Sequence, residues 1–142
     1  MGDRPQFGEA IDGVEAIVRP SAYCIIRRND GSIALVHTPK GDFLPGGGQH
    51  DDETLEQAAV RETIEETGLL TEIVSLIGEA DQFARKSDGR GVRKESSFFL
   101  AVVIGKGTKV EDDHDVVWLD PNKAASLLTH PSHAWAVSQI SE

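Results

Sequence analysis

The chain has 142 residues, which suits a single domain with one hydrophobic core. Apolar residues make up 39% and charged residues 27%, so a disordered chain is excluded. The absence of a long apolar run or a signal-peptide pattern predicts a cytoplasmic protein with no membrane partner. The net charge of −10 argues against a nucleic acid polymer as partner, because phosphate backbones bind mainly to basic side chains. A small anionic ligand remains open if a cation mediates its binding.

Cys24 is the single cysteine and lies in the apolar stretch "SAYCII". An intrachain disulfide is therefore impossible, and a metal site built on thiolates is excluded. We expect this thiol to be buried and structural.

The first half of the chain predicts two strands, a loop and a helix. Residues 21–28 and 32–38 are rich in strand formers, and the "NDG" between them predicts a β-hairpin. A Gly/Pro-rich loop follows and contains the short apolar piece Phe43-Leu44. Residues 53–67 favour helix, and Gly68 stands where a C-terminal cap belongs.

The second half predicts strands over 69–78 and 96–105, joined by a polar and basic loop at 85–95 that we expect to be mobile. A final strand is expected over 115–120, with helices after Pro121 and Pro131. Strands and helices mix without strict alternation. This order favours an α/β layered domain with a mixed sheet over a doubly wound parallel one.

Three glutamates, Glu62, Glu65 and Glu66, share one face of the predicted helix. At 100° per residue, Glu66 lies about 40° from Glu62 and Glu65 about −60°. The same face carries the small apolar residues that should pack on the sheet, namely Leu55, Ala58 and Ala59. The carboxylates therefore continue the inward side of the helix, which argues against a solvated acidic face.

Like charges at this spacing repel, and more strongly when they are partly buried. Arg61 can balance one carboxylate but not three, so a divalent cation is the natural partner. Carboxylates without thiolates or a nearby imidazole pair favour Mg²⁺ or Mn²⁺ over zinc.

The loop before the helix contains "LPGGG", with three glycines at 46–48. Glycines let the backbone approach a ligand or a metal closely. Taken alone the loop is weak evidence, because it lacks the Lys-Ser/Thr ending of a P-loop.

Loop and helix together match a longer pattern: Gly47, then Glu53 after five residues, then "RETIEETGL" at 61–69 after seven more. This pattern closely resembles the Nudix box, the 23-residue signature of the Nudix hydrolases. The flanks "RPSAYCII" and "DVVWLDPNKAASLL" are also similar to that family, so the resemblance covers roughly residues 17 to 130. It implies the Nudix fold, a mixed sheet between helices, in one domain over residues 1–142. It also implies hydrolysis of a nucleoside diphosphate linked to another group.

Matched position by position, the family pattern implies that Glu62, Glu65 and Glu66 are ligands of Mg²⁺ or Mn²⁺, with the backbone carbonyl of Gly46 as a further ligand. Arg61 joins them in the catalytic site by holding a glutamate in its ligating orientation, and Glu53 supports the site. The general base is either a glutamate of the box, with Glu65 preferred, or a loop carboxylate such as one from the acidic stretch 111–115.

The chain departs from the family pattern in two places. Thr63 stands where an aliphatic residue is usual, which weakens packing slightly. His50 stands where a loop glutamate is common, followed by Asp51 and Asp52. The metal that this glutamate would bind is held by one of these three residues or is absent.

Substrate contacts are predicted from Phe43, which could stack on a base, from the backbone of Gly47 and Gly48, and from Arg28. Phe83 is a second stacking candidate. Further phosphate partners are Arg27, Lys40, Arg85, Arg90, Arg93 and Lys94, of which the last four fall in the 85–95 loop. No chemistry is assigned to His37, His114, His130 or His133, because they show no ligand spacing.

Three functions remain open on the sequence. The first is a metal-dependent pyrophosphohydrolase, which is favoured because all three acids of the box are present. The second is a non-catalytic Nudix-fold module that binds a nucleotide or nucleotide sugar, and the third is a structural calcium or scaffold site. The sequence does not choose among nucleoside triphosphates, dinucleoside polyphosphates and ADP-ribose-type diphosphates. We expect a monomer or a homodimer, with residues 1–16 as a candidate pairing segment.

Overall fold

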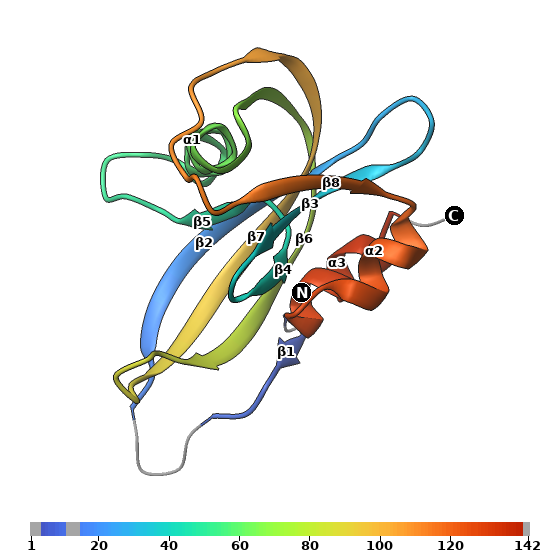
Figure 1. Ribbon diagram of the computed structural model, residues 1–142. Helices are drawn as coiled ribbons and strands as arrows, with labels where there is room; N and C mark the ends of the chain where they lie inside the picture. Colours follow the sequence, from blue (N-terminus) through green and yellow to red (C-terminus); the bar gives the residue numbers. More distant parts are fainter. Residues whose placement is uncertain (1–3, 11–14, 141–142) are drawn as a thin grey trace.

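A computed structural model describes residues 4–10 and 15–140, and its main feature is a five-stranded mixed sheet. The strand order is β1 (Gln6–Phe7), β6 (Leu69–Arg85), β7 (Gly91–Lys106), β2 (Ile17–Ile26) and β5 (Gly46–Gly48). β2 runs parallel to β7, whereas β6 and β7 are antiparallel, and these two form the long curved strands of Figure 1. The predicted mixed sheet is therefore confirmed.

A smaller sheet has the order β4 (Gly41–Phe43), β3 (Ile33–Thr38), β8 (Asp115–Leu119). The predicted hairpin between residues 21–28 and 32–38 is wrong, because β2 and β3 lie in different sheets. The turn itself forms, with the Arg28 N–H donating to Ser32 O at 2.9 Å and Gly31 at φ 89°. However, β2 is already paired on one edge with β7 and on the other with β5, so β3 pairs with β8 instead.

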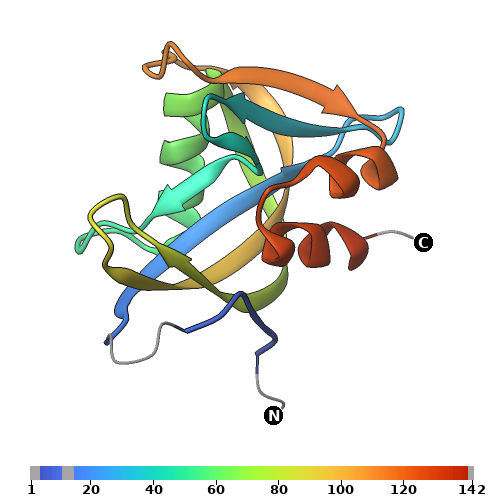
Figure 2. The ribbon, with the colours of Figure 1, turned by 60° about the horizontal axis from the view of Figure 1, so that its bottom comes forward.

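Helices lie on both sides of the strands, as expected (Figures 1 and 2). α1 (Leu55–Thr67) starts with a capping box between Thr54 and Gln57 and ends at Gly68, which has φ 75°. On the opposite side lie α2 (Pro121–Leu127) and α3 (Pro131–Ser138), each with a proline in its first turn. None of the described helices is long and apolar enough to cross a bilayer.

Alternate residues of β2 build two cores. Ala22, Cys24 and Ile26 face α1, whereas Tyr23 and Ile25 pack with residues of α2 and α3. The buried position of Cys24 is as predicted. This end of β2 is therefore buried on both faces, and α1 packs on one of them through Ala58 and Ala59.

The polar segment 85–95 is not one long loop. β6 continues to Arg85 and β7 begins at Gly91, so only residues 86–90 form the turn. Polar residues are tolerated in these strands because Arg93 and Glu95 form an ion pair at 3.3 Å on one side. Lys94 is therefore held on a strand and faces the opposite way from Arg93 and Glu95.

Candidate functional site

The carboxylates of the glutamate face are partly buried where α1 packs beside β5. The side chains of Glu66, Glu62 and Glu65 are 16%, 21% and 35% exposed. Glu66 Oε1 accepts a hydrogen bond from the Gly46 N–H at 2.9 Å, which fixes this carboxylate against the strand. These side chains therefore do not form a fully solvent-exposed acidic face.

Arg61 forms its shortest hydrogen bonds with Glu53 and the Gly48 carbonyl. Its Nη2 and Nε donate to the two carboxylate oxygens of Glu53 at 2.7 and 3.0 Å, and Nη2 also donates to Gly48 O at 3.0 Å. Its contacts with Glu62 and Glu65 are longer, at 3.2 and 3.4 Å. This pair holds the pKa of Glu53 down at about 2, through the hydrogen bonds from Arg61 and from His50 N–H. Arg61 therefore braces the loop before α1 and only partly balances the glutamate face.

The remaining carboxylates carry more negative charge than their surroundings compensate. Burial is the main reason that the pKa of Glu66 is raised to about 8, with repulsion from Glu62 and Glu111 adding to it. Burial also raises the pKa of Glu62. A hard divalent ion binds oxygen ligands, and these carboxylates need a positive partner. The residues present therefore fit such an ion.

The raised pKa of Glu66 predicts a pH-dependent stability of the metal-free protein. An unfolded glutamate ionises near 4.5, whereas Glu66 in the folded protein keeps its proton up to about pH 8. The folded state binds the extra proton in this window, so its free energy of unfolding falls as the pH rises towards 8. In chelator, Glu66→Gln should remove this loss and melt ~3 °C or more above the wild type at pH 8 but not at pH 5. Parallel Tm curves for the two proteins would contradict it.

The three glycines of β5 leave no room for side chains. Gly46 has φ 149°, and a Cβ there would lie 2.6 Å from the Tyr23 backbone. A Cβ on Gly47 would lie 2.7 Å from the carboxylate carbon of Glu62, and one on Gly48 2.6 Å from the guanidinium of Arg19. Close packing against α1 and β2 therefore explains the glycine run.

This packing predicts different effects at two neighbouring positions. Gly47→Ala should displace the Glu62 carboxylate and weaken Mn²⁺ binding by ~10-fold or more, about the value of one ligand contact. Gly48→Ala should displace only Arg19 and leave Mn²⁺ affinity within about twofold, so it serves as the control. Calorimetric Mn²⁺ titration of both variants checks this. Equal Mn²⁺ affinity in the two variants would show that the Glu62 carboxylate does not hold the ion.

The acidic loop before β8 reaches the same site. The N–H groups of Val110 and Glu111 donate to Glu65 O at 2.8 and 2.9 Å, which ties the loop to the end of α1. His114 Nε2 then lies 3.7 Å from Glu66 Oε2. The sequence does not predict a role for His114. Its contact with Glu66 is made by a loop, and residue spacing does not reveal such a contact.

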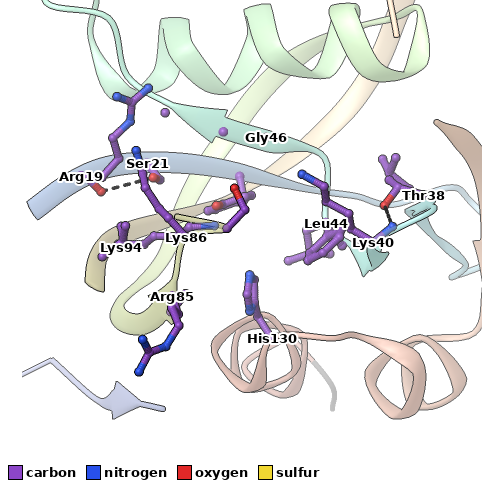
Figure 3. Close-up of a pocket in the computed structure, with 18 of the residues that line it drawn as sticks. Arg19, Ser21, Thr38, Lys40, Leu44, Gly46, Arg85, Lys86, Lys94 and His130 are labelled. Atoms are coloured by element: carbon purple, nitrogen blue, oxygen red, sulfur yellow. Dashed lines mark hydrogen bonds between the residues drawn. The ribbon is translucent and has the colours of Figure 1, made fainter. Parts of the chain in front are cut away.

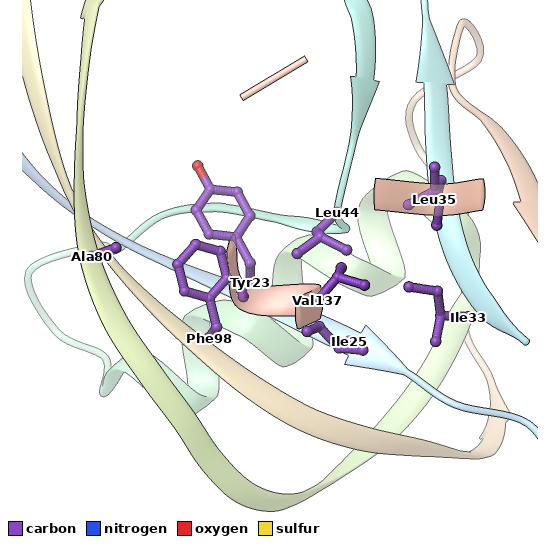
Figure 4. Close-up of a cluster of buried hydrophobic side chains, with 10 residues drawn as sticks. Tyr23, Ile25, Ile33, Leu35, Leu44, Ala80, Phe98 and Val137 are labelled. Carbon is purple, nitrogen blue, oxygen red and sulfur yellow. The ribbon is translucent and has the colours of Figure 1, made fainter. Parts of the chain in front are cut away.

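A cavity of about 780 Å³ opens beside Glu66, between β5, the end of the β6–β7 hairpin and His130, the residue before α3 (Figure 3). One side carries Arg19, Lys86 and Lys94, and the other carries Thr38 and Lys40. Tyr23 and Leu44 line the cavity and also belong to the buried cluster that contains Phe98 (Figure 4). The cavity therefore rests on a packed core.

The structure places the predicted substrate residues unevenly. Phe43, Gly47 and Gly48 line the cavity. Arg28 does not line the cavity, and its guanidinium lies 3.7 Å from the centroid of the Trp118 ring. Of the other candidates, Lys40, Arg85, Arg90 and Lys94 line the cavity, whereas Arg27, Phe83 and Arg93 do not.

The residues that line the cavity but were not predicted as substrate contacts include Arg19, Lys86 and His130. His130 lies with its ring centroid 5.2 Å from that of Phe43. The Gly46 carbonyl remains a predicted metal ligand; its N–H is the group seen to bind Glu66. Among the three residues near the missing loop glutamate, His50 is the one with a contact to Glu53, with its Nδ1 4.0 Å from Oε1.

Comparison with known proteins gives a consistent family. Residues 18–139 match the model of the NUDIX domain. The chain is 36% identical over 105 residues to an ADP-ribose pyrophosphatase of Methanocaldococcus jannaschii, covering 73% of this chain and 56% of the relative. It is 32% identical over 108 residues to an RNA pyrophosphohydrolase of Stenotrophomonas maltophilia, covering 68% and 52%. The chain thus spans about half the length of these curated relatives.

The fold agrees with this family. A NUDIX hydrolase from Nitrosomonas europaea superimposes with a TM-score of 0.72 at 18% identity, over 87% of this chain and 88% of the other. The match to the domain model extends over most of the chain and contains the glutamate helix, the glycine strand and every lining residue of the cavity except Ile17. The chain belongs to the Nudix hydrolase family.

Proposed function

We propose that the chain is a metal-dependent pyrophosphohydrolase that uses Mg²⁺ or Mn²⁺ to cleave the diphosphate linkage of a nucleoside triphosphate or another nucleoside diphosphate derivative. One observation carries the proposal. Three partly buried carboxylates share a single arginine whose shortest hydrogen bond goes to Glu53. The most buried of the three, Glu66, lies on the wall of a large cavity. Nudix hydrolases generally use divalent ions and act on small nucleotides, which agrees with this arrangement.

Glu62, Glu65 and Glu66 would hold the ions, together with the Gly46 carbonyl that the family pattern implies. When bound, the ions neutralise the phosphates, lower the pKa of the attacking water and stabilise the leaving oxygen. The Glu53–Arg61 pair is a positioning element, because it fixes the loop and the start of α1 against Gly48.

Two groups are candidates for the general base. Glu65 is the least buried of the three carboxylates of the glutamate face, with its side chain 35% exposed, and can reach water. Glu111 belongs to the acidic loop that is bonded to the Glu65 carbonyl. Separate Glu65→Gln and Glu111→Gln variants distinguish them by which one removes the acidic limb of the pH–rate profile, because the rate falls at low pH when the general base is protonated.

The far side of the cavity suits a nucleoside. The rings of Phe43 and His130 meet at an interplanar angle of 54°, and both line the cavity. Burial keeps the pKa of His130 low, at about 4, so its ring is neutral and available for stacking. An aromatic wall opposite a carboxylate site fits a base attached to a diphosphate.

The relatives support the bond type and leave the substrate open. Their names, ADP-ribose pyrophosphatase and RNA pyrophosphohydrolase, both describe cleavage at a diphosphate, but of very different molecules. The net charge of −10 still argues for a small nucleotide over an RNA chain as the substrate here. We also propose that residues 1–142 form one Nudix domain, in a monomer or a homodimer.

The experiment is a panel of nucleoside triphosphates, dinucleoside polyphosphates, nucleotide sugars and ADP-ribose, with release of phosphate and pyrophosphate measured in Mg²⁺, Mn²⁺ or chelator. Hydrolysis of one of these substrate classes supports the proposal if chelator abolishes it. Binding of a nucleotide without turnover would support the non-catalytic module instead. A higher Tm with metal but neither binding nor turnover would support a structural metal site.

A further inference from the structure

The cavity gathers cations although the protein is acidic. The whole chain has 14 lysines and arginines against 24 aspartates and glutamates. Among the residues that the structure describes, six of those 14 line the cavity, whereas the acidic residues on its wall are Glu66 and Asp88. Asp88 is paired with Arg90 at 2.7 Å, so it does not neutralise the other cations. This reversal of charge indicates an anionic ligand larger than the group held at α1.

Two of these cations lie side by side on neighbouring strands. Arg19 on β2 and Lys94 on β7 are register partners in the parallel ladder, and both line the cavity. Across the residues that the structure describes, neither forms an ion pair with a carboxylate. The nearest acid along β7, Glu95, is bonded to Arg4 at 3.0 Å and Arg93 at 3.3 Å on the other face of the strand.

Facing like charges destabilise a sheet, so this pair costs the free protein stability. Lys94 is half-buried, and its pKa is lowered by burial and by the charge of Arg19. Both side chains can donate charge-assisted hydrogen bonds, and an anion between them would remove their repulsion.

Arg19 lies across strand β5 from the glutamate face. Its guanidinium stands 2.6 Å from the Cβ position of Gly48, while the carboxylate of Glu62 stands 2.7 Å from that of Gly47. Side chains of consecutive strand residues point to opposite faces, so the two groups lie on opposite sides of β5. Glu66 and Arg19 nevertheless line the same cavity, so a group joined to a diphosphate held at Glu66 can reach Arg19.

We propose that Arg19 and Lys94 form an anion subsite that binds a phosphate of the substrate beyond the diphosphate bond that is cleaved. The substrate class is then a small nucleoside triphosphate or longer polyphosphate, not a diphosphate joined to a neutral sugar. This inference rests on the proposed function and deepens it. Lys86, on the 86–90 turn at the same side of the cavity, adds a third charge to the subsite (Figure 3).

Binding tests the subsite without turnover. Inorganic tripolyphosphate is titrated calorimetrically into the metal-free chain, its Arg19→Gln and Lys94→Gln variants, and Lys123→Gln, an exposed position on α2 that serves as the control. Each subsite variant should bind ~10-fold or more weakly, the value of one charge-assisted hydrogen bond, and the control should match the wild type. Equal affinity in all four proteins would overturn the proposal.

Kinetics test the substrate class. The wild type should have kcat/KM for ATP ~10-fold or more above that for ADP-ribose, and Arg19→Gln should lower only the ATP value, mainly through KM. Equal values for the two substrates, or equal losses in the variant, would overturn the class. A preference for 5′-triphosphorylated RNA over ATP would also overturn it. If nothing is hydrolysed yet tripolyphosphate binding depends on Arg19 and Lys94, the proposed function fails and the subsite stands.

Discussion

Glu66→Gln should lower kcat/KM for the cleaved nucleotide by ~10³-fold or more, because an amide cannot replace a carboxylate ligand of a divalent ion. The substitution removes the charge but changes the shape of the side chain very little. The glutamine oxygen can still accept the hydrogen bond from the Gly46 N–H, which is 2.9 Å long in the wild type. We therefore expect the variant to fold, and to lose activity for lack of charge. Steady-state hydrolysis at saturating Mg²⁺ measures the effect.

The matched control is Glu72→Gln, which removes the same charge from an exposed position on β6. Its activity should stay within about twofold of the wild type, since a surface charge this far from the cavity acts only through a screened field. A Glu66→Gln protein that keeps more than about a tenth of wild-type activity would show that Glu66 is not needed as a ligand.

Arg61→Lys should lower kcat by ~10²-fold, although the positive charge is kept. The arginine donates to both oxygens of Glu53 and to Gly48 O at once, with distances of 2.7, 3.0 and 3.0 Å. A lysine is a point charge on a flexible stem and cannot reproduce this planar fork. The loop at 46–53 would then lose its fixed position beside α1, and the ligand geometry would loosen.

Glu53→Gln should produce a loss of the same order, because it breaks the same pair from the other side, whereas Lys123→Arg on α2 should have no effect. The double variant Arg61→Lys/Glu53→Gln should be little worse than either single variant, since both act through one contact. Activity of Arg61→Lys within about twofold of the wild type would show that charge alone suffices at this position.

The parts of the fold that were predicted correctly are those set by local chemistry. The helix that became α1 was predicted from the helix propensity of residues 53–67, and its stop from Gly68, because propensity and caps act within a few residues. Strand pairing is different. The "NDG" turn forms, but residues 21–28 and 32–38 enter separate sheets because partners far along the chain, β7 and β8, compete for their edges.

The same distinction holds for the site. The convergence of Glu62, Glu65 and Glu66 was predicted, since it follows from one helix. The rest of the cavity wall was predicted in part: Phe43 and Lys94 were named. Arg19 and His130 were missed, because they come from segments more than 100 residues apart that meet only in the folded chain. Arg28 was named because of its charge, but a nearby ring, Trp118, takes its guanidinium instead.

The most direct test is whether the glutamate face holds the ion. Free Mn²⁺ is measured by electron paramagnetic resonance during titration of the chelator-treated chain and of a triple variant, Glu62→Gln/Glu65→Gln/Glu66→Gln. The wild type should bind Mn²⁺ and the triple variant should not. Equal binding would contradict the account and would move the ion to another cluster, for which Glu111, Asp113 and His114, whose ligand atoms lie within 4.8 Å of one another, are the alternative.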